Sequence, residues 1–194
     1  MNYKQNKVFF YNKISFTLFI FFVFYSLFFL SSCLTCDKKE YVFEFTGKGS
    51  GKLTITFYNL KSAKENGIDV SEKDFTELTS DYIEGNKLAQ EYPDAKVRQA
   101  KLFEKDGQLC GKVIVYFDQI EQVKLFQHEG KGPFMLYINN VAEYYQSSNG
   151  NYGGKDMPVV FWDKNQKILK LTTIYEQSNE ASVSLLDKFR NWKK

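Results

Sequence analysis

An uninterrupted apolar run near the amino terminus constrains this chain more than any other feature. Residues 14–30 carry no charged side chain, and Lys4, Lys7 and Lys13 precede them without any acidic residue before position 33. A basic segment followed by an apolar segment and small residues is the order of a secretory signal. The positive charges favour the cytoplasmic side while the apolar segment favours the bilayer. We therefore expect residues 1–32 to be a signal peptide, with the rest of the chain outside the cytoplasm.

The apolar run ends in Leu30-Ser31-Ser32-Cys33, which resembles the lipobox of bacterial lipoprotein precursors. This resemblance implies that a diacylglycerol group is attached to the thiol of Cys33 and that signal peptidase II cleaves before it. The acyl chains would then anchor the protein to a membrane of the cell envelope, since two or more chains give stable attachment. The alternative is an uncleaved signal-anchor helix, because the run exceeds the roughly 7–15 residues usual in a signal and approaches a membrane span.

The charges left after the signal are balanced. Residues 1–32 hold three of the 26 lysines and arginines and none of the 23 acidic residues, so the mature chain is close to neutral. A nucleic-acid partner is therefore not expected, because such proteins carry a basic surface. Residues 33–194 suffice for one domain with a hydrophobic core.

The first residues of the mature chain are predicted to be a spacer. The stretch that ends at Glu40 is polar and has no periodicity, so we expect a lipidated tether over 33–40 and a single domain over 41–194. Once Cys33 is acylated, Cys36 and Cys110 remain. Outside the cytoplasm these two thiols can form a disulfide, which would stabilise the fold by about 2–4 kcal/mol. The alternative is two free thiols.

Alternating strands joined by short turns dominate the domain. Residues 41–46 and 52–58 alternate on either side of Gly47-Lys48-Gly49-Ser50-Gly51, which predicts a β-hairpin. This glycine-rich turn is not a phosphate loop, because a strand and not a helix follows it. A second hairpin is expected over 96–117, around the turn at 105–108.

Three helices are expected among these strands. The first begins at Ser71, with Phe75, Leu78, Tyr82 and Ala89 at helical spacing. The second is short, and the third begins at Ser178 or Asn179. Their inward-facing residues are predicted to be Ile120, Val123 and Phe126 for the second helix, and Val183, Leu185, Leu186, Phe189 and Trp192 for the third. Further strands are expected over 134–139, 141–146, 159–162 and 167–176, the last two paired with each other.

This order predicts an α+β fold: an antiparallel sheet of hairpins with two or three helices packed on one face, preceded by the N-terminal signal helix. The opening hairpin with Gly49-Ser50-Gly51 in its turn, then a helix and a second hairpin, resembles lipoprotein domains of the LppM type in bacteria. Domains of that type carry a C-terminal membrane helix, whereas the last helix expected here is amphipathic.

Few residues point to catalysis. His128 is the only histidine and stands in a polar stretch, which favours a solvated surface position over a nucleophilic triad. The mature chain shows no metal-ligand spacing, so no metal or other cofactor is expected. An extracytoplasmic hydrolase with two carboxylates in a cleft stays open as an alternative, since such a pair needs no local spacing.

Aromatic side chains concentrate in one region and point to binding. Tyr144, Tyr145, Tyr152 and Trp162 surround a polar loop, and such side chains suit shallow recognition surfaces, although strands also use them in the core. We therefore expect a membrane-anchored, non-catalytic lipoprotein whose domain binds an envelope or extracellular protein, lipid or glycan. A structural subunit of an envelope complex is the other alternative to the hydrolase.

Overall fold

The computed structural model describes residues 34–138, 142–175 and 181–194. The chain divides into the unit Met1–Ser32 and the unit Cys33–Lys194, and only the second is described here. The expected signal helix, the lipobox cysteine and the expected helix caps Ser178 and Asn179 lie outside the described residues. The predicted α+β class is confirmed, because antiparallel sheets and short helices make up the described unit.

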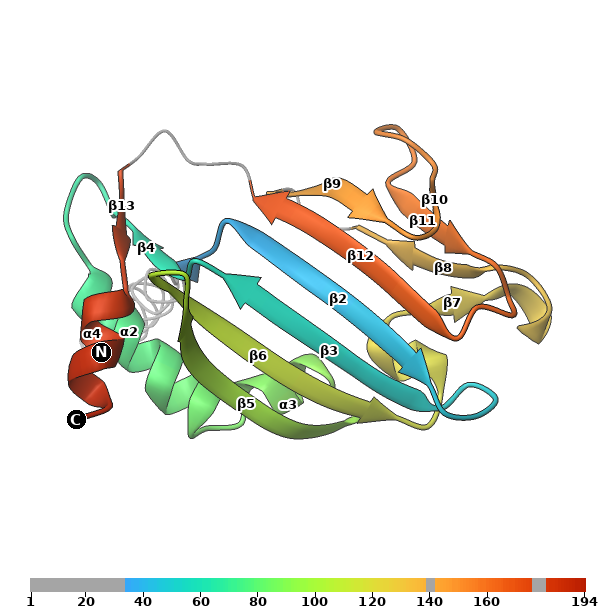
Figure 1. Cartoon of the computed structure of the whole chain (residues 1–194), viewed down its shortest axis with the longest axis horizontal. Helices are drawn as coiled ribbons and strands as arrows, with labels where there is room; N and C mark the ends of the chain where they lie inside the picture. Colours follow the sequence, from blue (N-terminus) through green and yellow to red (C-terminus); the bar gives the residue numbers. More distant parts are fainter. Residues whose placement is uncertain (1–33, 139–141, 176–180) are drawn as a thin grey trace, which may run out of the picture. The chain divides into compact units, whose positions relative to one another are not determined.

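A six-stranded antiparallel sheet is the centre of the fold (Figure 1). The predicted hairpins provide four of its strands, and two strands from the second half of the chain extend it. In spatial order they are β5 (Lys96–Lys105), β6 (Gln108–Phe117), β3 (Gly51–Tyr58), β2 (Lys38–Phe45), β12 (Ile168–Tyr175) and β9 (Glu143–Ser148).

Both predicted hairpins are confirmed, and their turns explain their register. Phe45 pairs with Gly51 across the first turn, where Gly49 has a φ of 81°. Lys105 pairs with Gln108 across the second. Asp106 and Gly107 there have φ values of 51° and 71°, as a two-residue turn that matches strand twist requires.

A second, four-stranded sheet covers part of one face of the large sheet, which we call the inner face. Its side chains join those of the large sheet in one core: Trp162 lies with its ring centroid 6.5 Å from that of Phe43, and Phe134 stacks on Phe45 at 4.7 Å. In spatial order its strands are β10 (Asn151–Tyr152), β11 (Val159–Trp162), β8 (Phe134–Tyr137) and β7 (Phe126–Gln127).

The expected pairing of 159–162 with 167–176 is wrong. β11 pairs with β8 and β10, whereas β12 pairs with β2 and β9, so the chain crosses from one sheet to the other between them. The predicted second helix is the 3-10 helix η2 (Ile120–Val123), which precedes β7. A further 3-10 turn, η3 (His128–Gly130), follows β7. Ile120 and Val123 are buried as predicted, but Phe126 is 53% exposed because it belongs to β7, and Leu125 is buried instead.

Helices cover the rest of the inner face, with α3 lying across β5 and β6 (Figure 1). The predicted helix at Ser71 is confirmed as α2 (Ser71–Glu77), which continues into the π-helix η1 (Leu78–Ile83) and, after a break, α3 (Lys87–Glu91). The amide of Glu84 donates to the carbonyl of Thr79, five residues back, as a π-helix requires. Val70 precedes the helix as its N-cap residue, and the amide of Ser71 donates to the Asp69 carboxylate.

Residues 34–40 of the expected tether take part in strands or in the link between them. Leu34 and Thr35 form β1 (Leu34–Thr35), which pairs with β4 (Lys61–Ala63), and β2 already begins at Lys38. The polar residues are accommodated because alternate positions of β2 face solvent. With β13 (Ser182–Ser184), β1 and β4 make a third small sheet.

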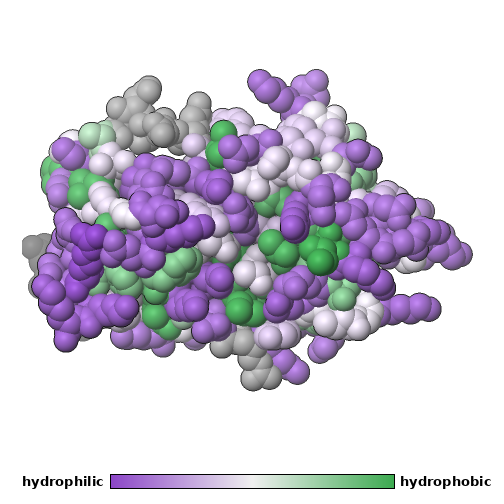
Figure 2. Space-filling model, in the orientation of Figure 1, coloured by the Kyte–Doolittle hydropathy of each residue, from purple (hydrophilic) through white to green (hydrophobic). Residues whose placement is uncertain are grey.

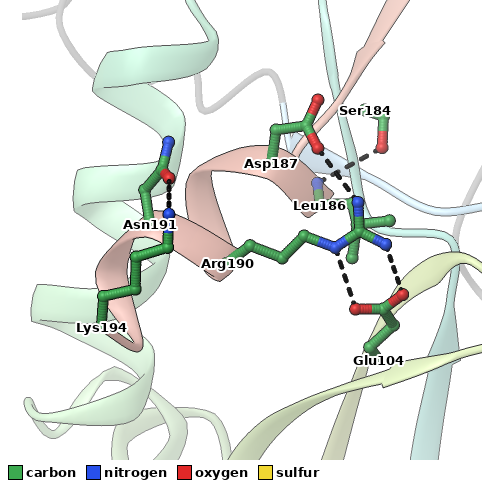
Figure 3. A network of polar contacts seen from close by, with 7 residues as sticks. All are labelled: Glu104, Ser184, Leu186, Asp187, Arg190, Asn191 and Lys194. Carbon is green, nitrogen blue, oxygen red and sulfur yellow. Dashed lines mark hydrogen bonds and ion pairs between the residues drawn. The ribbon is translucent and has the colours of Figure 1, made fainter.

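The last helix, α4 (Leu186–Trp192), completes a second apolar cluster. Leu185, Leu186 and Phe189 are buried as predicted, while Val183 belongs to β13 and Trp192 is 46% exposed. Figure 3 shows how the guanidinium of Arg190 grips both carboxylate oxygens of Glu104 on β5, with donor–acceptor distances of 3.0 and 2.6 Å. This pair is half exposed, so it fixes the helix position more than it adds to stability.

The outer face of the large sheet is not covered by another described element. Its residues alternate with the inward ones and mix charged, threonine and apolar side chains, among them Tyr116, Ile168 and Ile174. Figure 2 accordingly shows small apolar areas separated by hydrophilic side chains. No helix within the described ranges is long and apolar enough to span a bilayer.

Candidate functional site

A cavity lies between the large sheet and the helical cover. Its volume is about 240 Å³. The sheet contributes Ile55, Phe57 and Val113, and the cover contributes Leu78 and Leu88 from η1 and α3. Most of this wall is apolar, and the volume exceeds the roughly 150 Å³ that suffices for a benzene-sized ligand.

The cavity exists partly because small residues occupy its floor. At Gly111 of β6 an added Cβ would meet the Leu60 side chain at 3.3 Å, so any larger residue would project into the space. Ala100 on β5 lies opposite Val113 and lines the same region. The π-turn of η1 widens the cover, because Leu78, Tyr82 and Ile83 all line the cavity from it.

One side of the cavity is polar. Lys39, Tyr41 and Tyr175 line it, and all three interact with the carboxylate of Glu143 on β9. The distances to the carboxylate oxygens are 3.4 Å from Lys39 Nζ, 2.8 Å from Tyr41 Oη and 3.2 Å from Tyr175 Oη, and Thr173 donates a further hydrogen bond. The side chain of Glu143 is only 8% exposed, so these partners are what permit a charge there.

The ion pair is charged on both sides. Burial raises the pKa of Glu143, but the Lys39 ammonium and the hydrogen bonds from Thr173 and Tyr41 outweigh burial, so its pKa lies below the ordinary value. Burial lowers the pKa of Lys39, but the charge of Glu143 outweighs it and the pKa is raised. Burial chiefly raises the pKa of Tyr175 to about 12, so its hydroxyl stays protonated and can donate. The Lys39–Glu143 pair therefore adds hydrogen-bond donors to this side of the cavity without adding net charge.

Of the two possibilities for the thiols, a disulfide or two free cysteines, the structure has the second. Cys36 and Cys110 are both free and buried. Cys36 packs with Leu109 and lines the cavity, whereas Cys110 follows Leu109 in β6 and so points to the opposite face of the sheet. Burial raises the pKa of the Cys36 thiol to about 12, so it behaves as an apolar group in the cavity wall.

The four aromatic residues predicted as a binding surface do not form one. Trp162 is 1% exposed because its side chain packs in the core between the two sheets. Its indole N–H donates to the side chain of Asn149. Tyr145 and Tyr152 are half-buried and stack on each other with centroids 4.0 Å apart. Tyr144 faces the other side of β9, where it is 44% exposed. Strand alternation thus separates residues that are neighbours in sequence.

Other predicted chemistry is placed as follows. His128 is exposed at the surface, as the sequence indicates, with Glu129 as its nearest ion-pair partner at 4.0 Å. Within the described ranges no group of three or more His, Cys, Asp or Glu side chains could hold a metal ion.

The functional residues that sequence reasoning missed are Lys39 and Glu143. They stand 104 positions apart, and Lys39 was assigned to a tether. A signal was present in the alternation of Lys39, Tyr41, Phe43 and Phe45, which continues the strand pattern back by one step beyond Tyr41. A charged residue at an inward position of such a strand indicates a buried partner.

Comparison with protein-family models, with curated proteins and with solved structures finds no match.

Proposed function

We propose that this chain is a bacterial lipoprotein, cleaved before Cys33 and held outside the cytoplasm by acyl chains on that residue, whose domain binds an apolar ligand without catalysis. The observation that carries the binding role is the cavity of about 240 Å³, lined mostly by apolar side chains and on one side by Lys39, which pairs with Glu143. Ligand pockets in proteins are concave and mostly apolar with a few polar groups, which is the character of this lining.

The geometry favours binding over hydrolysis. A carboxylate hydrolase needs two acids that face each other across the substrate. The acid that lines the cavity is Glu91, and it is exposed; Glu143 is buried beside the cavity, and its oxygens already accept hydrogen bonds from Tyr41, Thr173 and Tyr175. Its pKa lies below the ordinary value, whereas a general acid needs a raised one. We therefore assign Glu143 to the support of the cavity wall.

The anchor is tested on the protein made in a bacterium that processes lipoproteins. Mass spectrometry of the membrane-bound form is expected to give an acylated Cys33 as the first residue. The variant Cys33→Ser is expected to lose the acyl label while its domain still folds. A membrane-bound chain that begins at Met1 and carries no acyl group would contradict the proposal and favour a signal anchor.

A further inference from the structure

The described chain leads from the lipobox directly into the cavity wall. Leu34 and Thr35 are fixed by pairing with Ser62 and Lys61 of β4, and both residues, together with Cys36, line the cavity. Cys33 is the residue before Leu34, and consecutive Cα atoms are about 3.8 Å apart. Resting on the lipoprotein function proposed above, we infer that the cavity holds one acyl chain, taken either from the lipid on Cys33 or from a lipid of the anchoring membrane.

The wall suits a hydrocarbon chain. Most of the side chains that line the space are aliphatic or aromatic, among them Leu34, Ile55, Phe57, Leu78 and Leu88. Removing methylenes from water is favourable, so each methylene of the chain that enters this space adds to binding. The cover stays in place around the chain, because Lys87 pairs with Glu77 and its ammonium lies 4.7 Å from the Tyr82 ring centroid.

The polar side suits the ester group at the end of such a chain. The ammonium of Lys39 lines the cavity as a hydrogen-bond donor, and an ester carbonyl accepts hydrogen bonds without adding charge. Lys39 is already neutralised by Glu143, so a carboxylate ligand would bring an unbalanced negative charge into a buried site. Both the diacylglyceryl group expected on Cys33 and a glycerolipid offer a neutral ester.

Site-specific photocrosslinking in the lipidated full-length protein, in its own membrane, tests this inference. Tyr82→p-benzoylphenylalanine places the probe in the cavity wall. Tyr116→p-benzoylphenylalanine is the matched control on the open face of β6, where the tyrosine is 47% exposed. We expect acyl adducts at position 82 and about tenfold fewer at position 116, a ratio that corresponds to about 1.4 kcal/mol.

The mass of the adduct identifies the source. A crosslink between the peptide that contains position 82 and the N-terminal lipopeptide identifies the chain on Cys33, whereas an adduct of lipid mass alone identifies a membrane lipid. Gly111→Val and Ala100→Leu narrow the cavity from two strands, and each is expected to reduce the adduct about tenfold. Gln99→Leu is their control, because Gln99 is exposed beside Ala100 on the other face of β5.

Two outcomes would overturn the inference: equal yields at positions 82 and 116, or a full yield in both narrowed variants while their melting temperatures match that of the wild type. These results are distinguishable from failure of the lipoprotein function, since the N-terminal mass of the same sample reports whether Cys33 is acylated.

Discussion

The carboxylate of Glu143 interacts with four side chains, those of Lys39, Tyr41, Thr173 and Tyr175. Substituting Glu143 therefore tests how the cavity wall is maintained. Glu143→Gln keeps the shape but leaves the Lys39 ammonium buried without its counter-charge. We expect the free energy of unfolding at pH 7 to fall by about 3–5 kcal/mol, the cost of breaking a buried pair from one side. Urea unfolding of both proteins measures the difference.

The matched control is Glu40→Gln. Glu40 also accepts hydrogen bonds from a lysine and a tyrosine, Lys38 and Tyr58, but its side chain is 35% exposed. We expect a loss within about 1 kcal/mol, as is usual for exposed pairs. Equal losses in the two variants would show that burial does not set the strength of the Glu143 pair.

The same residue predicts a pH dependence. The folded-state pKa of Glu143 lies below its ordinary value of 4.5, so the native state binds fewer protons there than the unfolded chain does. Its contribution to stability is present above that ordinary value and is lost as the pH falls through the folded-state pKa. The difference in unfolding free energy between the wild type and Glu143→Gln should therefore shrink on acidification from pH 7. A constant difference down to pH 3 would contradict this assignment.

The two thiols give a further test at single positions. Because Cys36 and Cys110 are buried on opposite faces of the sheet, we expect neither to react with Ellman's reagent in the native protein and both to react after unfolding without reductant. A chain that yields no thiol after unfolding would show that the two residues are paired and that the arrangement of β1 and β6 differs from the one described.

Among the secondary-structure elements, the π-helix depends on a glycine at its end. A Cβ at Gly85 would lie 2.6 Å from the carbonyl oxygen of Ser80 and 2.7 Å from that of Asp81, both backbone atoms. We expect Gly85→Ala to destabilise the fold by about 1–3 kcal/mol, as overpacking does. Gly132→Ala is the control, since its nearest contact is 3.4 Å and no change is expected. Thermal unfolding compares them, and equal melting temperatures would argue against the close turn at Gly85.

Local elements were predictable where chemistry and pattern agree within a short stretch. The turn at Asp106-Gly107 and the alternation of β3 and β6 specify their hairpins from sequence alone. The pairing of β11 with β8 and of β12 with β2 was not predictable, because partners far apart in sequence leave no local signal. For the same reason β4 and β13, three residues each, were read as loop and helix.

The candidate site was less predictable than the fold. The cavity depends on two small residues, Ala100 and Gly111, and on a polar pair that joins β2 to β9 across β12. The aromatic residues of 144–162 carried a stronger local signal, but three of the four, Tyr145, Tyr152 and Trp162, pack in or against the core between the two sheets. Composition could therefore indicate an aromatic-rich region without distinguishing a recognition surface from a core.

At the scale of the whole molecule, the prediction concerns how the domain meets its anchor. A free tether over 33–40 would let trypsin cut at Lys38 or Lys39 and release the domain intact. In the structure both lysines belong to β2, which lies between β3 and β12, so the backbone there is hydrogen-bonded on both sides. Proteases need local opening, and central strands open with nearly the free energy of global unfolding.

We therefore expect native, membrane-bound protein to resist trypsin at these two sites. Lys155 in the exposed segment between β10 and β11 serves as the internal positive control, since it should be cut first. Mass spectrometry of the released fragments is the measurement, with urea-unfolded protein as the reference for full cleavage. A soluble fragment that begins at Lys39 or Glu40 would contradict the paired β2. It would also count against an acyl chain of Cys33 in the cavity, which requires Leu34 and Thr35 to be fixed in the cavity wall.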